Sequence, residues 1–366
     1  MSLPAQAGVF AFALQAAKIG RGGTFDPTAV TWHRAKAPAI AIGTIIDDQV
    51  FPLEVGGAIV PTGAFRQGVF FAGQATIHPR AEKIFGHLLK ATLGAASSVT
   101  GVNWVGTTTV GVNTHIFRFS TASAFFQPWM AVRRMAPGEL AADNMGETGF
   151  DCKVATLALA IPQMGPLSCQ LTMMGRDSIF DDASTWTYSA AYEDSVSVPQ
   201  SGNGSFKMSG VEYPLTGAVI EFNNGLTQPQ QEMIIGDLRP DDFIAITRSA
   251  TIRIVYKVEN YDLYQKILSG AVDQATWSPF PYIESTVGGT PAFEGIFQSG
   301  TNIPTTSTPY TLRVVANRVM WKTDGPLQLQ AGGIIQQSFT GTVLEPASGD
   351  YFTISLSNNA TAATYA

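Results

Sequence analysis

The amino-acid sequence predicts a mainly β protein of the α+β class, organised as two tandem antiparallel β-sandwich or barrel-like domains that each carry one packed helix. Three observations lead to this prediction: an alternation of apolar and polar residues with a period of two, two isolated stretches with helical spacing, and a match between the two halves of the chain. The length agrees, because 366 residues exceed what one hydrophobic core usually organises.

The alternation that predicts strands is clearest late in the chain. Between Ala250 and Glu259 every second residue is apolar, and charged residues lie between them. The same alternation occurs from His115 to Phe119, from Leu157 to Ile161 and from Phe352 to Leu356. Strands of this kind have one face in the core and one face in solvent, which is typical of antiparallel sheets.

Two stretches have apolar residues at helical spacing, and each directly follows a predicted strand. The first runs from about Pro79 to Leu93, with proline at a position that tolerates it and Gly94 as the stop. The second runs from about Tyr261 to Ser269, with Asn260 as the cap and Gly270 as the stop. The sequence therefore predicts one helix in each half.

An ungapped match relates the two halves. Phe150 to Gln170 aligns with Tyr310 to Gln330 at a constant shift of 160. The matched residues include Phe150 with Tyr310, Lys153 with Arg313, Val154 with Val314, Leu159 with Val319, Gln170 with Gln330, and the run Gly165, Pro166, Leu167 with Gly325, Pro326, Leu327. We interpret the match as a duplication; two unrelated hairpins with Gly-Pro turns are the alternative.

The duplication predicts the domain boundaries. We expect a first domain at residues 1–200 and a second at 206–366, joined by the Gly- and Ser-rich segment Ser195 to Ser205. Each domain has a long excursion between its early strands, at residues 43–68 in the first and 223–242 in the second. Connections this long are usually functional or bound to a partner, so we expect protruding hairpin arms.

The composition points to self-association. Hydrophobic residues make up 45% of the chain and charged residues 14%, whereas about 25% charged residues is typical. Such a surface is expected to be covered by partners or by copies of the chain. The net charge of -6 argues against a general nucleic-acid binder but suits a surface past which DNA slides.

No catalytic, cofactor-binding or metal-binding residue is predicted, and we expect no enzyme. The four histidines lie in no hydrolase, metalloprotease or P-loop motif, and packing or surface roles are expected for all of them: His33, His78, His87 and His115. Four acidic pairs lack the spacing of a calcium loop, so we interpret them as solvated turns. These pairs are Asp47 and Asp48, Asp181 and Asp182, Glu193 and Asp194, and Asp241 and Asp242.

Cys152 and Cys169 have no CxxC spacing and form no disulfide framework, which favours buried thiols. The apolar run Gly8 to Ala17 has its basic residues, Lys18 and Arg21, after it and not before it, which disfavours a signal peptide. No apolar run is long enough to predict a membrane span. We therefore expect synthesis and assembly in the cytoplasm.

Two smaller clusters invite interpretation. The glycines around Arg21 (Gly20, Gly22 and Gly23) follow no buried strand of a βαβ unit, so they predict a loop or N-terminal arm and not a phosphate site. Arg133 and Arg134 lie near Trp129 against an acidic background, which we interpret as an intersubunit contact.

One long stretch, FPLEVGGAIVPTGAFRQGVFFAGQATIHPRAEKIFGHLLKATLG at Phe51 to Gly94, resembles the central region of tail tube proteins from long-tailed phages. Further blocks are similar to the same family: PWMAVRR at 128–134, GPLSCQLTMMGR at 165–176, and, in the second half, AVIEFNNGL at 218–226, ATIRIVYKVENYDLYQKI at 250–267 and YFTISLSNN at 351–359. The resemblance covers most of the chain as a series of short blocks.

The resemblance implies two packed antiparallel sheets flanked by a helix, with subunits that join their sheets into rings and rings that stack into a hollow tube. Rings of this family ordinarily contain six copies of the fold, so a chain with two copies would close a pseudo-six-fold ring as a homotrimer. The implied function is structural: a major tail tube subunit of the virion tail, assembled in the host cytoplasm, through which DNA passes during ejection. The implied partners are tape measure, tail terminator and distal tail proteins, and DNA in the lumen without specific binding, with no cofactor and no membrane.

The residues expected at the ring and stacking interfaces lie on the two arms. They are Phe51, Glu54, Phe65 and Arg66 on the first arm, and Met233, Asp237, Arg239 and Asp241 on the second. Another phage virion β-protein, such as a distal tail or decoration protein, is one alternative. A carbohydrate-binding β-sandwich module is the other, and its candidate cluster is Trp186, Tyr188, Tyr192 and Asp194.

Overall fold

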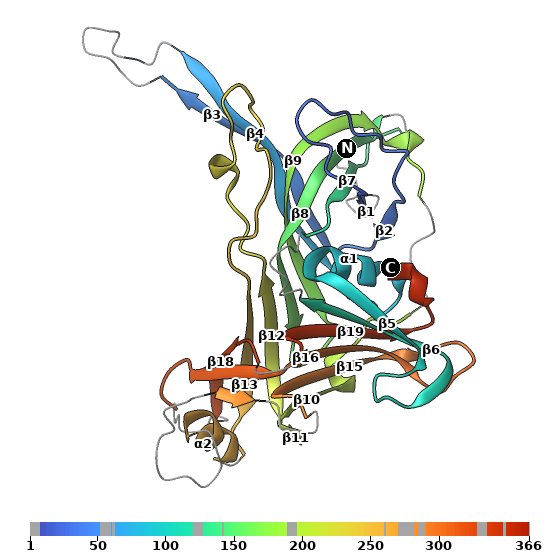
Figure 1. The fold of residues 1–366 in the computed structure, drawn as a ribbon, viewed down its shortest axis with the longest axis vertical. Helices are drawn as coiled ribbons and strands as arrows, with labels where there is room; N and C mark the ends of the chain where they lie inside the picture. Colours follow the sequence, from blue (N-terminus) through green and yellow to red (C-terminus); the bar gives the residue numbers. More distant parts are fainter. Residues whose placement is uncertain are drawn as a thin grey trace.

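The computed structural model describes residues 8–51, 60, 63–119, 127–140, 143–188, 196–259, 261–269, 282–284, 290–327, 335–346 and 349–365. The described chain is mainly β, with two antiparallel sheets and two α-helices (Figure 1). This confirms the predicted fold class at the level of a mainly β chain with antiparallel sheets and packed helices.

The strands of the first half are β1 (Val9–Leu14), β2 (His33–Ala35), β3 (Ala39–Val50), β4 (Ala64–Ile77), β5 (Gly94–Val102), β6 (Thr108–Phe119), β7 (Met130–Ala136), β8 (Met145–Ile161) and β9 (Ser168–Asp182). Those of the second half are β10 (Gly204–Met208), β11 (Val211–Glu212), β12 (Leu215–Asn223), β13 (Ser249–Lys257), β14 (Tyr282–Glu284), β15 (Phe293–Asn302), β16 (Pro309–Ala316), β17 (Arg318–Thr323), β18 (Gln336–Val343) and β19 (Phe352–Asn358). The helices are α1 (Lys83–Leu93) and α2 (Asp262–Ser269).

Both sheets contain strands from both halves. Among the described residues, the larger sheet has the order β14-β17-β18-β13-β12-β8-β7-β1-β2, and β9, β4 and β3 extend from β8 as a branch. The smaller sheet has the order β11-β10-β15-β16-β19-β6-β5. The halves therefore meet at two strand pairs, β8 with β12 and β6 with β19.

The core fills the space between the two sheets and continues through both halves. One cluster of buried residues runs from Phe10 on β1 to Tyr365 near the C-terminus. Helix α1 lies at the junction of the sheets (Figure 1), and its apolar side chains Leu88 and Leu89 are fully buried. Tyr365 packs against Gly86 on α1, where a Cβ atom would lie 2.4 Å from the tyrosine ring. The end of the chain thus seals the core of the first half.

The predicted strands follow the observed ones closely. In β13 the side chains of Ile252, Ile254 and Tyr256 are buried while Arg253 and Lys257 are exposed, as the alternation predicts. Strand β19 differs, because its polar Ser355 and Ser357 are buried as well. The neighbours β16 and β6 cover its edges, and the burial of both alternating sets of side chains shows that both of its faces are covered as well.

The predicted helices are correct in type. Gly94 ends α1 with a φ of 94°, and its N–H donates to the carbonyl of Lys90, as expected for a glycine stop. The predicted start at Pro79 is wrong: the helix begins at Lys83, after the extended N-cap Glu82. Helix α2 begins at Asp262, and its expected cap Asn260 and stop Gly270 lie outside the described residues.

The predicted linker, over its described part, is bonded to both halves: Ser197 bonds Thr301, and Gly204 and Ser205 begin β10, which pairs with β15. Leu167 N–H donates to the carbonyl of Pro199, and Arg80 Nε donates to the carbonyl of Val196. Within the described chain, no helix has the length and apolar character needed to cross a membrane.

Candidate assembly surfaces

Strands β3 and β4 form a long hairpin that projects from the body of the molecule (Figure 1). Their register runs from Ala39 opposite Thr76 to Val50 opposite Ala64, and Phe51 N–H then donates to the carbonyl of Gly63. Asp47 and Asp48 lie at a register shift inside β3, so the prediction of a solvated turn is wrong for this pair. We call residues 45–51 and 63–68 the first arm.

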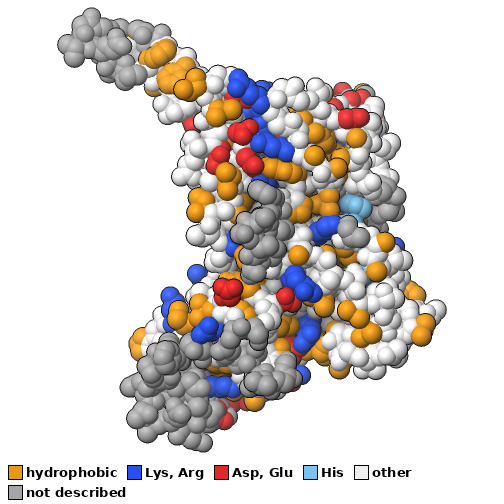
Figure 2. Space-filling view, in the orientation of Figure 1, with side chains coloured by type: hydrophobic (Ala, Val, Ile, Leu, Met, Phe, Trp, Pro, Cys, Tyr) orange, Lys and Arg blue, Asp and Glu red, His pale blue; other side chains and the backbone are white. Residues whose placement is uncertain are grey.

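The first arm exposes apolar side chains, which Figure 2 shows in orange on its described part. Ile46 is 49% exposed, Val50 63%, Phe51 50% and Phe65 41%. The rings of Phe51 and Phe65 contact each other, with their centroids 5.3 Å apart. A two-stranded ribbon is only marginally stable by itself, so apolar residues at its end are expected to serve contacts with other molecules.

The excursion between β12 and β13, residues 224–248, which we call the second arm, folds back onto the first half. Its base is fixed by Asn224, which is fully buried. The backbone N–H of Asn224 donates to the carbonyl of Ala155, and its side-chain amide donates to the carbonyls of Thr92 and Val154. The second arm is thus anchored to α1 and β8.

The two arms contact each other. Val69 N–H on β4 donates to the carbonyl of Leu238, and a Cβ atom on Gly68 would lie 2.6 Å from the Met233 side chain. Gly68 therefore allows the close approach of the second arm to β4. Figure 1 shows the second arm running beside β4 along the edge of the body.

Ion pairs fasten the second arm to the first half. Arg176 and Asp237 are 4% and 10% exposed, with 2.9 Å between nitrogen and oxygen. Arg239 pairs with Asp177 at 2.6 Å, and Lys18 pairs with Asp241 at 3.3 Å. Figure 2 shows the resulting band of acidic and basic side chains below the first arm. Charges that leave water need such partners, so the second arm is held by pairing rather than by apolar burial alone.

Lys153, which is 5% exposed, makes a further contact of this kind. Its Nζ donates to Asp242 at 2.9 Å and to the carbonyl of Phe243 at 2.7 Å, and it lies 3.8 Å from the centroid of the Trp129 ring. Burial lowers the pKa of Lys153, while the hydrogen bond and charge of Asp242 act in the opposite direction. Asp242, the second half of an acidic pair, therefore serves to hold the second arm.

The structure divides the predicted interface residues into two groups. Phe51, Phe65 and Arg66 are exposed on the first arm, and Glu54 lies outside the described residues. The second-arm residues Met233, Asp237, Arg239 and Asp241 contact the first half of their own chain. Sequence reasoning missed their partners, among them Arg176 and Asp177, because these lie some 60 positions away in the chain without a motif.

Apart from the outer edges of the end strands β2 and β5, two strand edges of the first half have no strand partner among the described residues. Strand β3 pairs only with β4. Strand β9 pairs with β8 along its length, but with β4 only from Cys169 to Gly175, so that its end from Arg176 to Asp182 is open. Open edges carry backbone groups that can pair with another chain.

Arg133 of the arginine pair is internal, so the interpretation as an intersubunit contact is wrong for this residue, whereas Arg134 is 34% exposed. Arg133 is 4% exposed and lies between the rings of Trp32 and Trp186, 4.0 and 4.6 Å from their centroids. Arg134 pairs with the buried Glu147. Trp186 also donates to Asp181.

The proposed carbohydrate cluster is only partly described, since Tyr192 and Asp194 lie outside the described residues. The Arg133 guanidinium lies over the ring of Trp186. The Arg34 guanidinium lies over the ring of Tyr188, 4.5 Å from the ring centroid. Each ring thus has a face covered by an arginine of its own chain, which does not favour a sugar-binding platform.

The glycine-rich loop binds a carboxylate of the same chain. Ile19 N–H and Gly20 N–H donate to Asp151 at 2.8 and 2.9 Å, and Gln15 donates at 3.1 Å. Asp151 is fully buried and has a φ of 51°. The loop therefore closes over β8, in agreement with the prediction of a loop rather than a phosphate site.

The histidines and cysteines have packing roles in the described structure. His87 on α1 stacks on His33, with 4.3 Å between ring centroids, and His115 hydrogen-bonds Ser98 and Asn358. Both cysteines are buried free thiols, as predicted, and burial raises the pKa of each.

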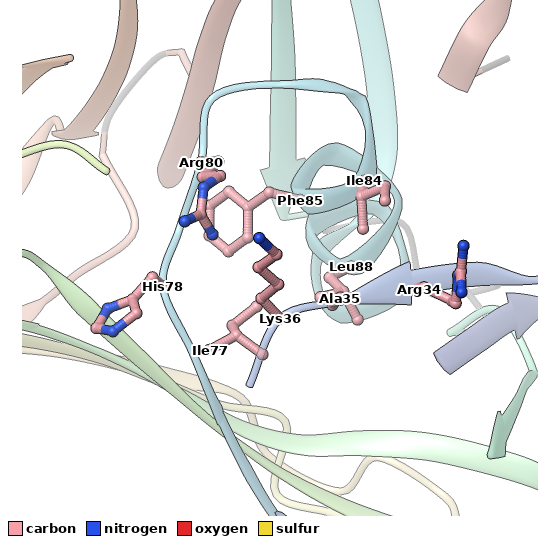
Figure 3. A pocket seen from close by; sticks show the side chains of 9 residues that line it. All are labelled: Arg34, Ala35, Lys36, Ile77, His78, Arg80, Ile84, Phe85 and Leu88. Atoms are coloured by element: carbon pink, nitrogen blue, oxygen red, sulfur yellow. The ribbon is translucent and has the colours of Figure 1, made fainter. Parts of the chain in front are cut away.

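A small basic cavity lies at the start of α1 (Figure 3). Lys36 and Arg80 turn toward each other above Ile77 and Phe85, with His78 at one side. The cavity volume is about 30 Å³, whereas an organic ligand needs roughly 300 Å³ or more. The cavity has room for a water molecule or two and for no organic cofactor.

Comparison with known protein families decides which class of protein these surfaces belong to. The model of one family, described as phage tail tube protein, matches residues 61–343. The chain belongs to this family. A comparison with curated proteins gives no match.

Membership of the tail tube family assigns the chain to the phage tail. Proteins of this family are structural components that assemble with themselves and with other tail proteins, and they are normally not enzymes. The matched region begins at residue 61, just before residues 63–68 of the first arm, and ends with β18. It therefore contains most of the contacts that hold the second arm to the first half.

Proposed function

We propose that this tail tube protein is the major tube subunit, that each chain carries two copies of the tube fold, and that three chains form a ring which stacks into the conduit for DNA. The observation that carries the proposal is the joining of the two halves through both sheets, at β8 with β12 and at β6 with β19. A subunit whose halves already share sheets can share them with its neighbours in the same way, and ring closure leaves no open edge.

The strand orders support two copies. The first half contains the order β2-β1-β7-β8-β9, and the second half contains β11-β10-β15-β16-β19 in the same chain sequence. The branch β8-β9-β4-β3 has its counterpart in β17-β18-β13-β12. In this reading β16 and β17 together correspond to β8, and β18 and β19 correspond to β9. We place the copies at residues 1–200 and 206–366.

Burial of the aligned residues supports the same reading. The pairs related by the shift of 160 are buried alike: Phe150 and Tyr310 are 3% and 5% exposed, Val154 and Val314 are both 0%, and Leu159 and Val319 are 2% and 0%. Both members of the charged pair bind a carboxylate, since Lys153 contacts Asp242 and Arg313 contacts Glu294.

The remaining parts of the proposal rest on the exposed first arm, on the net charge and on membership of the tail tube family. The first arm, with Phe51, Glu54, Phe65 and Arg66, contacts a neighbouring chain or ring, and the net charge of -6 keeps DNA from adhering to the lumen. Tape measure, tail terminator and distal tail proteins are the partners at the tube ends. The virion tail is the site of function after assembly in the host cytoplasm.

Electron microscopy of negatively stained protein tests the proposal, together with native mass spectrometry of the smallest assembly. We expect hollow tubes or rings, and a ring mass of three chains. A protein that stays monomeric with and without tail partners would overturn the proposal. Single rings that never stack would favour a distal tail protein instead.

A further inference from the structure

The junction between the two halves provides a pattern for the junction between chains. In the larger sheet β8 pairs with β12 over six residues, from Thr156 opposite Asn223 to Ile161 opposite Ala218. In the smaller sheet β6 pairs with β19, from Asn113 opposite Asn358 to Arg118 opposite Thr353. The second half thus contributes two edge strands to the junction, β12 and β19, and these pair with β8 and β6 of the first half.

The corresponding edges of the first half are the open ones. By strand order β12 corresponds to β3, and β19 corresponds to the end of β9. Among the described residues neither β3 nor residues 176–182 of β9 has a strand partner on that side. Among the described residues, the first half therefore presents two edges without a strand partner, which correspond to the edges that the second half presents to the first. Side chains of the same chain contact both edges: Glu147 accepts from the Thr44 N–H of β3, and the second arm pairs with Arg176 and Asp177 of β9.

Equivalent positions in the two halves give the register in which β3 would pair with a neighbouring chain. Ile252 and Gly73 each lie ten residues before the first residue of the helix that follows, Asp262 and Lys83. Ile252 is opposite Ile220 on β12, and Gly73 is opposite Ile42 on β3. Ile42 is thus the counterpart of Ile220, and each is 2% exposed.

The other side of the contact follows from the internal repeat. Ile220 is opposite Leu159 on β8, and the shift of 160 relates Leu159 to Val319 on β17. On the basis of the proposed ring, we propose that β3 of one chain pairs antiparallel with β17 of the next, with Ile42 opposite Val319. A second copy of this chain is the partner, and its second half also covers the open end of β9.

Strand β17 is covered in the single chain by the short strand β14. Among the described residues that contact comprises three residue pairs, from Tyr282 with Met320 to Glu284 with Arg318, whereas the β8–β12 contact comprises six. The longer strand β3 forms more backbone hydrogen bonds, so it replaces β14 when the ring closes. Until then β14 shields the edge from premature pairing, which is a common use of short edge strands.

Engineered cysteines test the register directly. The proposed pairing places Ala41 opposite Met320, and both side chains are exposed in the single chain. Opposite residues of antiparallel strands have Cα atoms about 4.5–5.5 Å apart, within the range of a disulfide. The native Cys152 and Cys169 are fully buried and do not interfere. The variant is A41C/M320C, assembled under reduction and then oxidised.

We expect covalent trimers of A41C/M320C on non-reducing gels. The matched control is A41C/K322C, which moves one cysteine by two residues on the same face, to about 7–8 Å, and should crosslink at least tenfold more slowly. Stained images of the same samples show whether rings are present. Rings without crosslinking, or with equal crosslinking of both variants, would overturn this register while the proposed function stands; absence of rings would overturn both.

Hydrogen exchange of the unaltered protein gives a second measurement, which does not depend on the cysteine variants folding or assembling. Amides of residues 39–43 that do not already bond to β4 should become at least tenfold better protected on assembly, because the proposed register places these residues opposite Lys322 to Arg318 of β17. Unchanged exchange at these residues in assembled rings would contradict the proposal.

Discussion

The two arms occupy the same place in the chain order, each between two early strands of its half, yet they differ in what holds them. The second arm lies on the first half and is fastened by pairs such as Arg176 with Asp237 and Lys153 with Asp242. The first arm projects and exposes Phe51 and Phe65. The second arm packs on a half of its own chain, whereas the first arm has no such half beside it. This difference indicates that an arm packs against the adjacent half when that half belongs to the same chain. Changes in the second arm should therefore affect folding, and changes in the first arm should affect assembly.

The largest effect is expected from Phe243→Ala at the base of the second arm. Phe243 is fully buried against Ala155 and Leu226, and truncation of such a side chain costs about 3–5 kcal/mol. Phe51→Ala on the first arm is the matched control and should cost under about 1 kcal/mol, because Phe51 is 50% exposed. Urea unfolding of the unassembled protein measures both. Equal shifts of the unfolding midpoint would contradict the contrast between the arms.

A smaller contrast is expected from two arginine–aspartate pairs. Arg176→Met removes the buried partner of Asp237 and should cost about 2–3 kcal/mol, with Arg21, 3.8 Å from Asp237, limiting the loss. Arg66→Met removes the ion pair with Asp48. Because Arg66 is 48% exposed and Asp48 is 53% exposed, the loss should cost at most about 0.5 kcal/mol of stability. The same unfolding experiment compares them, and raised salt should weaken only the exposed pair. A large loss with Arg66→Met would show that the first arm is held by its charges.

The sequence predicts those parts of the fold that depend on local pattern. Alternation places Ile252 and Ile254 on the buried face of β13, and Gly94 ends α1 where expected. The start of α1 is missed because proline only permits a helix start, whereas the chain stays extended up to Glu82. Local signals thus give the type of each element better than its limits.

The contacts of the buried charged residues, among them those that hold the second arm, could not be predicted because they join distant residues. Glu147, Asp151 and Lys153 interrupt the apolar pattern of β8 and are nonetheless buried. Their partners lie on other elements, more than 80 positions away for Lys153 and 130 for Asp151. Only the repeat carried long-range information, since it relates positions of one half to those of the other. For the same reason the arms could be located from the sequence, but not the surface on which each one lies.

Acid is expected to weaken the junction of the halves, where His87 of the first half contacts Tyr365 at the end of the second. Burial, followed by the charges of His33 and Lys90, lowers the pKa of His87 to about 3. The unfolded chain binds this proton near pH 6.5, so stability from neutral His87 is complete above pH 6.5 and is lost as the pH falls toward 3.

The His87→Gln variant should therefore lose stability less steeply than the unaltered protein between pH 6 and pH 4. The difference in slope is at most about 1.4 kcal/mol per pH unit, and partial exposure of His87 reduces it. His33 and His115, whose pKa values are lowered by burial, leave a residual slope in the variant. Unfolding free energies at a series of pH values measure this. Identical slopes would show that His87 is not the group that responds.

The smallest effect on folding, with the largest on assembly, is expected from Phe51→Ser combined with Phe65→Ser. The two rings contact each other on the exposed end of the first arm, so their loss should change the stability of the single chain by under about 0.5 kcal/mol. The same change removes most of the aromatic surface that the described part of the first arm offers to a neighbouring chain or ring, and aromatic anchors carry much of the binding energy of interfaces. Sedimentation and stained images should then show folded single chains, or rings that do not stack, at concentrations where the unaltered protein forms tubes. Normal tubes from this variant would mean that the projecting arm is held in the assembly by its backbone edge, with its apolar end playing no part.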